Sequence, residues 1–157
     1  MPDSGVPGEV ANEAGDEQTV VATVLVAEDE PVVRVSVADA LADAGFNVIE
    51  AGSGTAAARI LASNRIDVLF ADVRIGQGPD GIELARRLRA ANPAAIIVIG
   101  TATAVPESEL EVADSAFRKP YAVDAVVDRI ERLLGDRRTG DARGGADRAR
   151  ARTVRNR

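Results

Sequence analysis

Charged side chains stand at the ends of three apolar runs in this sequence. Asp72 ends one run, the pair Glu28-Asp29 ends a second, and Lys119 follows a third. In an open parallel sheet the carboxyl ends of the strands lie along one edge, and ligands bind there. Acids and one lysine at such an edge predict a site for a divalent cation and a phosphoryl group.

The chemistry of such a site is phosphoryl transfer. Crowded carboxylates repel each other, and a hard cation such as Mg²⁺ relieves that repulsion while keeping places for water and phosphate. A carboxylate beside the cation, here Asp72, can attack a phosphoryl group and become an aspartyl phosphate. Lys119 could pair with the phosphoryl oxygens as a point charge, and the hydroxyl of Thr101 could bond another oxygen.

The composition excludes several other kinds of chemistry. The 157 residues include no Cys and no His, which rules out a disulfide, a thiol nucleophile and an imidazole base. No apolar run approaches the roughly 20 residues of a membrane span, and no signal-peptide pattern opens the chain. We therefore expect a cytoplasmic protein that makes no membrane contact.

Charge divides the chain into three regions. Residues 1–20 carry five acids and no base, and residues 135–157 carry eight arginines and three acids. We expect both segments to be disordered and the folded domain to occupy residues 21–134. The Arg-rich tail lacks aromatic residues and a helix-turn-helix pattern, so we expect no specific DNA binding.

Strand and helix patterns alternate through the expected domain. Apolar runs predict strands at 20–27, 46–50, 66–71, 95–100 and 115–118. Helical spacing predicts helices from Pro31 to Gly45, over 56–64, from the N-cap Asp80, over 106–113 as a short fourth helix, and over 123–134. Five βα units with short connections predict an α/β fold with a doubly wound, five-stranded parallel sheet.

Four fragments on this frame resemble the receiver domain of bacterial two-component response regulators. They are the acidic end of the first strand at 24–31, the phosphoacceptor strand at 70–74, the helix start at 80–84 and the Lys-Pro-aromatic motif at 118–121. The resemblance covers about residues 22–134. It implies a flavodoxin-like (βα)5 fold and a phosphorelay role in signal transduction.

The resemblance also implies the ligands of a magnesium ion. Asp72 would be the phosphoacceptor and would also face the metal. Asp29 would bind Mg²⁺ directly and Glu28 mainly through water, while the backbone carbonyl of Arg74 would be a further ligand. Glu30, next to this acidic pair, is interpreted as a surface charge.

The same resemblance assigns the residues that would contact the phosphoryl group. Lys119 would be one of them, and its peptide bond to Pro120 would be cis. The family's Thr/Ser position falls on Thr101 if Gly100 lies within the fourth strand, and on Gly100 if the frame shifts by one residue. We favour Thr101.

The sequence departs from the family pattern at three places. The loop at 74–81 is about one residue longer than the commonest form and lacks its usual proline. Ala116 stands where the family usually carries an aromatic switch residue, and Thr101 to Lys119 spans only 18 residues. The family's usual rotamer switch and dimer face are therefore not implied, and we expect a monomer or a weak dimer.

The sequence is compatible with three functions. The leading hypothesis is a stand-alone receiver that accepts phosphate from a histidine kinase or a phosphotransfer protein, and then signals by protein contact or drains phosphate from a shared kinase. The alternative is a receiver-like interaction module that works without phosphorylation. A Mg²⁺-dependent phosphohydrolase is disfavoured because such enzymes usually need an acid two residues after the nucleophile, where this chain has Arg74. We expect no enzymatic turnover of an outside substrate.

Overall fold

Five parallel strands form one sheet in the computed structural model, which describes residues 21–143. The strands are β1 (Thr23–Ala27), β2 (Asn47–Ala51), β3 (Val68–Asp72), β4 (Ile96–Thr101) and β5 (Ser115–Arg118). Their spatial order is β2-β1-β3-β4-β5. The predicted α/β fold with a doubly wound parallel sheet is confirmed.

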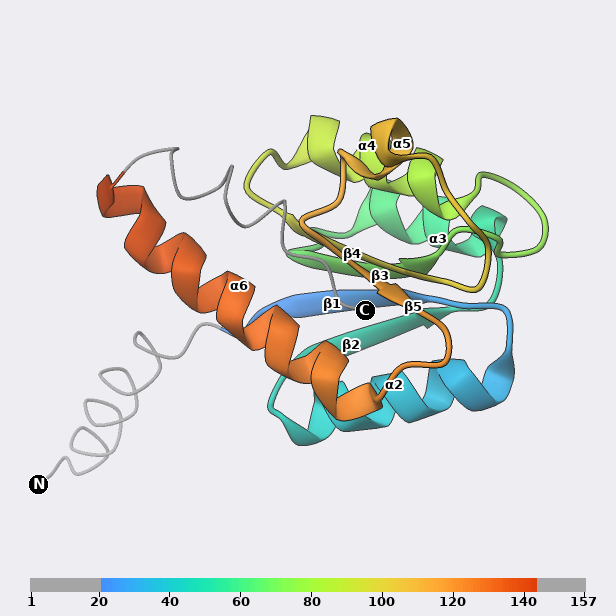
Figure 1. Ribbon diagram of the computed structural model, residues 1–157, viewed down its shortest axis with the longest axis horizontal. Coiled ribbons are helices and arrows are strands. Elements are labelled where there is room, and N and C mark those ends of the chain that lie inside the picture. The colour runs from blue at the N-terminus through green and yellow to red at the C-terminus, as the bar shows by residue number, and fades with distance from the viewer. Residues whose placement is uncertain (1–20, 144–157) are drawn as a thin grey trace, which may run out of the picture.

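Helices cover both faces of the sheet. They are α2 (Pro31–Asp43), α3 (Gly54–Ser63), α4 (Gly81–Ala91), α5 (Glu107–Leu110) and α6 (Val123–Arg143). α2 and α6 lie on one face, and α3, α4 and α5 lie on the other (Figure 1). The predicted fourth helix is α5, which is short, as expected, with only four residues.

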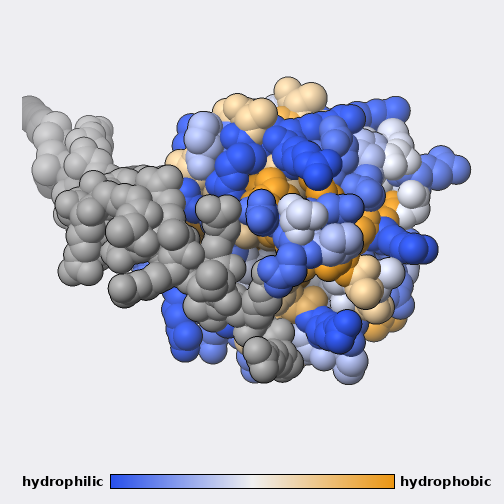
Figure 2. Space-filling view, turned by 45° about the horizontal axis from the view of Figure 1, so that its top comes forward, coloured by the Kyte–Doolittle hydropathy of each residue, from blue (hydrophilic) through white to orange (hydrophobic). Residues whose placement is uncertain are grey.

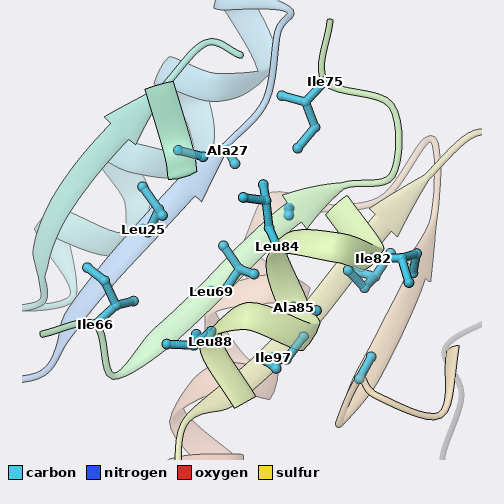
Figure 3. Close-up of a cluster of buried hydrophobic side chains, with 14 of the residues drawn as sticks. Leu25, Ala27, Ile66, Leu69, Ile75, Ile82, Leu84, Ala85, Leu88 and Ile97 are labelled. Atoms are coloured by element: carbon cyan, nitrogen blue, oxygen red, sulfur yellow. The ribbon is translucent and has the colours of Figure 1, made fainter. Parts of the chain in front are cut away.

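Alternate residues of each central strand face the two helical layers. Leu25, Leu69 and Ile97 pack against α3 and α4 in one core (Figure 3). Val26 and Phe70 belong to the second core, under α2 and α6. Both faces of β3 and β4 are therefore buried, which is why these strands appear in the sequence as continuous apolar runs. On the outside, hydrophilic side chains cover most of the face seen in Figure 2, with hydrophobic residues showing between them.

Local sequence signals set the helix starts. Pro31 is the first residue of α2, where its missing N–H costs nothing. The side chain of Asp80 caps α4 by accepting a hydrogen bond from the backbone N–H of Glu83 over 2.8 Å. Gly45 follows α2 with a φ of 102°, a conformation that favours glycine. These predicted boundaries are confirmed.

The end of the last helix differs from the expectation. α6 continues past Leu134 and Gly135 to Arg143, so the expectation of disorder from residue 135 is wrong for residues 135–143. A glycine inside a helix costs only about 1 kcal/mol, and the turn after it is tied down. Arg137 Nη2 lies 3.6 Å from Asp114 Oδ1 and donates a hydrogen bond to the carbonyl oxygen of Ala95.

Two predicted segments fall where the structure gives no description. Residues 1–20 and 144–157 lie outside the described residues, so the expectations for them stay predictions. Within residues 21–143, no helix has the length and apolar character needed to cross a membrane.

Candidate functional site

The sheet register brings the acidic strand ends together. Ala27, the last residue of β1, is paired with Ala71, so Glu28 and Asp72 follow at the same level of adjacent strands. On the other side, β4 pairs with both β3 and β5, and the backbone N–H of Lys119 donates to the carbonyl oxygen of Thr101 over 3.0 Å. The carboxyl edge of the sheet thus gathers the residues that the sequence indicated.

Lys119 lies at the centre of this cluster. Its Nζ atom is 2.8 Å from Asp72 Oδ2, 3.0 Å from Glu28 Oε1 and 3.1 Å from Glu30 Oε1. Burial opposes the charged ammonium, but the three carboxylates outweigh it and raise the pKa of Lys119. Lys119 is also the only lysine in the chain, and its bond to Pro120 is cis, as the resemblance implied.

Glu28 is the most deeply buried acid of the site. It is 1% exposed, and this burial raises the pKa of its carboxyl group. Its Oε2 atom accepts a hydrogen bond from the backbone N–H of Glu30 over 3.1 Å. Its Oε1 atom is close to Lys119 Nζ but is not aligned with it as a hydrogen bond, and it has no other partner in the described part of the chain. One buried carboxylate oxygen therefore remains available to a cation.

The backbone of Glu28 is fixed from both sides. Its N–H donates to the carbonyl oxygen of Ala51 on β2 over 3.0 Å. Its carbonyl oxygen accepts a hydrogen bond from Arg34 Nη1 over 2.9 Å, and Arg34 Nε donates to Glu50 Oε1 over 3.2 Å. Arg34 therefore ties the turn after β1 to β2.

Asp72 is held where β3 meets the following loop. Its residue exposure is 7%, and Oδ1 accepts a hydrogen bond from the backbone N–H of Arg74 over 3.2 Å. The start of α4 packs directly on this strand end. A Cβ on Gly81 would lie only 2.2 Å from the carbonyl oxygen of Asp72. Glycine at position 81 therefore permits the close approach that encloses the phosphoacceptor candidate.

Two of the predicted residues, Asp29 and Thr101, are not among the side chains that form these ion pairs. Thr101 ends β4 and is buried, but Gly100 is the residue paired with Asp72. The hydroxyl oxygen of Thr101 accepts a hydrogen bond from the backbone N–H of Thr103 over 3.1 Å. Asp29 is exposed. The roles assigned to these residues, and to the carbonyl of Arg74, stay predictions.

The sequence interpretation underestimated Glu30. Its side chain is 63% exposed, as a surface charge would be, yet Lys119 Nζ donates a hydrogen bond to its Oε1 atom. The two residues are 89 positions apart in the chain, so no local pattern could indicate the contact. The only available signal was the position of Glu30 directly after the acidic pair and before the helix-starting Pro31.

Tyr121, two residues after Lys119, packs against the second core. Its ring packs edge-on against Phe70 and Phe117, with centroids 5.7 Å and 6.0 Å away. Its hydroxyl group is buried and, among the described residues, has no hydrogen-bond partner. Burial, and then the negative charge of Glu28, raise the pKa of Tyr121 to about 12. The phenol therefore stays neutral across the physiological range.

The oxygen donors of the cluster fit Mg²⁺. Within residues 21–143 there is no group of three His, Cys, Asp or Glu side chains that could hold a metal ion alone. Mg²⁺ does not require one, because it usually takes one or two carboxylates and fills its other positions with water and phosphate. Glu28 and Asp72 supply two carboxylates, and the unbonded Oε1 of Glu28 is a buried acceptor that a cation would satisfy.

A hollow lies beside the site where β4 and β5 end. It has a volume of about 190 Å³ and is lined by Thr101, Leu110 and Ala116, among others. Leu110 belongs to the four-residue α5 and Ala116 to β5. The small side chain of Ala116 therefore lines a hollow where the family usually carries an aromatic residue.

Comparison with known proteins shows the family of this chain. The family model described as "Response regulator receiver domain" matches residues 24–131. The chain is 36% identical over 124 residues to the probable transcriptional regulatory protein TcrX of Mycobacterium tuberculosis, covering 75% of this chain and 51% of TcrX. The chain thus spans about half the length of that relative. It is also 33% identical over 119 residues to a cyclic di-GMP phosphodiesterase from Thermotoga maritima, covering 73% of this chain and 32% of that relative.

Solved structures agree with the sequence relatives. A CheY-like receiver domain protein from Methanospirillum hungatei superposes with a TM-score of 0.70 at 18% identity, covering 76% of this chain and 98% of that one. The response regulator TrrA of Thermotoga maritima, solved in complex with Mg²⁺-BeF, gives a TM-score of 0.64 at 25% identity, covering 72% and 99%. The chain belongs to the response regulator receiver domain family, whose members are signalling modules of two-component systems.

Proposed function

We propose that this domain accepts a phosphoryl group on Asp72 in a Mg²⁺-dependent reaction and so relays a signal. The observation that carries the proposal is the ion-pair cluster at the carboxyl edge of the sheet. Lys119 Nζ lies 2.8 Å from Asp72 Oδ2 and 3.0 Å from the buried Glu28. This places the lysine beside the atom that would carry the phosphoryl group.

The transfer follows from these positions. A carboxylate oxygen of Asp72 attacks the phosphorus of a phosphohistidine, the P–N bond breaks, and the histidine leaves with the electron pair and takes up a proton. Lys119 is protonated throughout and can pair with a phosphoryl oxygen as negative charge accumulates. Mg²⁺, when bound, would neutralise the phosphoryl oxygens, with Glu28, Asp29, Asp72 and the carbonyl of Arg74 as its candidate ligands.

The partners in this proposal are a sensor histidine kinase or a phosphotransfer protein on the input side. On the output side the partner is a protein that binds the phosphorylated domain, or the domain drains phosphate from a shared kinase. A cytoplasmic location agrees with the lack of a membrane-spanning helix in residues 21–143. The complex of TrrA with Mg²⁺-BeF supports the choice of metal.

Intact mass after incubation with acetyl phosphate tests the proposal. We expect one phosphoryl adduct in the presence of Mg²⁺ and none after the metal is chelated. Asp72→Asn should show no adduct, whereas Asp128→Asn, an exposed acid on α6, is the matched control and should behave like the wild type. An acid-labile adduct retained in folded Asp72→Asn would contradict the assignment of the phosphoacceptor.

The second candidate function is an interaction module that does not depend on phosphorylation. Ala116 and the four-residue α5 favour it, because they remove an aromatic switch and shorten a helix near the site. It predicts that partner binding is the same with and without beryllofluoride. A change in partner affinity on adding beryllofluoride would count against this candidate and for phosphorylation.

A further inference from the structure

Three carboxylates surround the ammonium group of Lys119 in the unmodified domain. Their oxygens lie 2.8 to 3.1 Å from Nζ, and Glu30 Oε1 accepts a hydrogen bond from it. A phosphoryl oxygen on Asp72 would also pair with this ammonium group. The phosphoryl group would therefore compete with the carboxylates that already contact Lys119.

Exposure decides which contact is released. The side chain of Glu28 is 1% exposed and that of Asp72 is 10% exposed, whereas that of Glu30 is 63% exposed. Asp72 loses its own carboxylate charge when it takes the phosphoryl group, so the comparison is between Glu28 and Glu30. Leaving the buried Glu28 without its counter-ion is costly, but water can solvate Glu30 once the lysine leaves. The phosphoryl group, with a charge of about −1.5 to −2, would also repel Glu30.

We propose that Glu30 is a positioning residue that holds Lys119 in the unmodified domain and competes with the incoming phosphoryl group for its ammonium. The inference rests on the function proposed above and extends it to a residue that sets the rate of phosphoryl uptake. Because Glu30 holds the ammonium group that the phosphoryl group would pair with, Glu30 slows phosphorylation. Removing the contact should raise the rate about twofold to fivefold, the effect of one exposed ion pair.

Three variants separate the contact from the charge. Glu30→Gln removes the charge, and Glu30→Asp keeps it on a side chain one methylene shorter, which withdraws it from Lys119. Asp39→Asn, an exposed acid further along α2, is the control for net charge. The readout is the initial rate of adduct formation with acetyl phosphate at fixed Mg²⁺, by intact mass. We expect both Glu30 variants to react faster than the wild type and Asp39→Asn to match the wild type.

Several results would overturn the inference. A rate of adduct formation for Glu30→Gln equal to or below that of the wild type would show that Glu30 does not compete for Lys119. A fast Glu30→Gln with Glu30→Asp at the wild-type rate would show that charge acts without contact. If the wild type forms the adduct and both Glu30 variants form it at the wild-type rate, only this inference is overturned. If the wild type forms no adduct, the proposed function is overturned as well.

The single lysine offers a second measurement that needs no phosphorylation. Lysine-selective ¹³C labelling gives one Cε signal, that of Lys119, because the chain has no other lysine. We expect this signal to shift in Glu30→Gln and Glu30→Asp, and to stay in place in Asp39→Asn. An unchanged signal in both Glu30 variants would show that the contact is absent in solution. Far-UV circular dichroism verifies that each variant is folded, which we expect because Glu30 lies outside both cores.

Discussion

Arg34 reaches from α2 to the end of β1 and donates a hydrogen bond from Nη1 to the carbonyl oxygen of Glu28 over 2.9 Å. The same guanidinium is paired with Glu50 on β2. A residue outside the acidic cluster therefore holds the peptide group that joins two candidate metal ligands, Glu28 and Asp29.

Arg34→Gln should therefore weaken Mg²⁺ binding. Partners that orient metal ligands typically contribute tenfold or more to affinity, so we expect a loss of about tenfold. Isothermal titration calorimetry with Mg²⁺ measures the affinity directly. Arg65→Gln is the control, since Arg65 is paired with Asp67 just before β3 and its side chain is 79% exposed. Equal affinities for both variants would show that Arg34 does not orient the ligands.

Lys119→Met should make stability depend on Mg²⁺. The substitution leaves Glu28 and Asp72 close together without a counter-ion, so the free energy of unfolding should fall by roughly 1–3 kcal/mol, less than for a fully buried pair. Mg²⁺ should restore part of this loss because it supplies the missing positive charge. Urea unfolding with and without Mg²⁺ measures both effects. If Mg²⁺ stabilised the variant less than it stabilises the wild type, this account of the cluster would be wrong.

Tyr121→Phe should make the free energy of unfolding decline less steeply with rising pH in the alkaline range. An unfolded chain releases the tyrosine proton near pH 10, while the folded domain, with its pKa raised to about 12, keeps it. The stabilising contribution is therefore complete below about pH 10 and is lost as the pH rises toward 12. Urea unfolding from pH 8 to 11.5 should show a shallower decline for the variant. Parallel declines would contradict the raised pKa, which the absorbance of this single tyrosine at alkaline pH also reports.

Gly100→Ala and Gly135→Ala should change stability in opposite directions. A Cβ on Gly100 would lie 2.9 Å from Phe70 Cζ and 3.1 Å from Tyr121 Cε2, so we expect a loss of about 1–3 kcal/mol from overpacking. A Cβ on Gly135 meets nothing within 4 Å, and alanine favours a helix over glycine by about 0.5–1 kcal/mol. Thermal unfolding of both variants measures the contrast. A destabilised Gly135→Ala would contradict the continuation of α6 through that residue.

Much of the fold and of the site follows from local sequence patterns. Apolar runs at 66–71 and 95–100 predicted strands, and the structure has β3 and β4 there. Pro31 and Asp80 marked helix starts because their backbone chemistry suits those positions. Asp72 and Lys119 could be predicted as site residues because each stands at the end of an apolar run. The carboxyl ends of parallel strands lie along one edge of the sheet.

Other features depend on contacts between distant parts of the chain. Glu30 resembled a surface charge until folding brought Lys119 within 3.1 Å of it. Residues 135–157 were expected to be disordered, but α6 continues to Arg143, and Arg137 is held against Asp114 and Ala95. Local patterns in the sequence predicted the order of the elements and the edge where the charges gather. Which charges pair is visible only in the folded domain, because an ion pair depends on distances across strands and not on spacing along one of them.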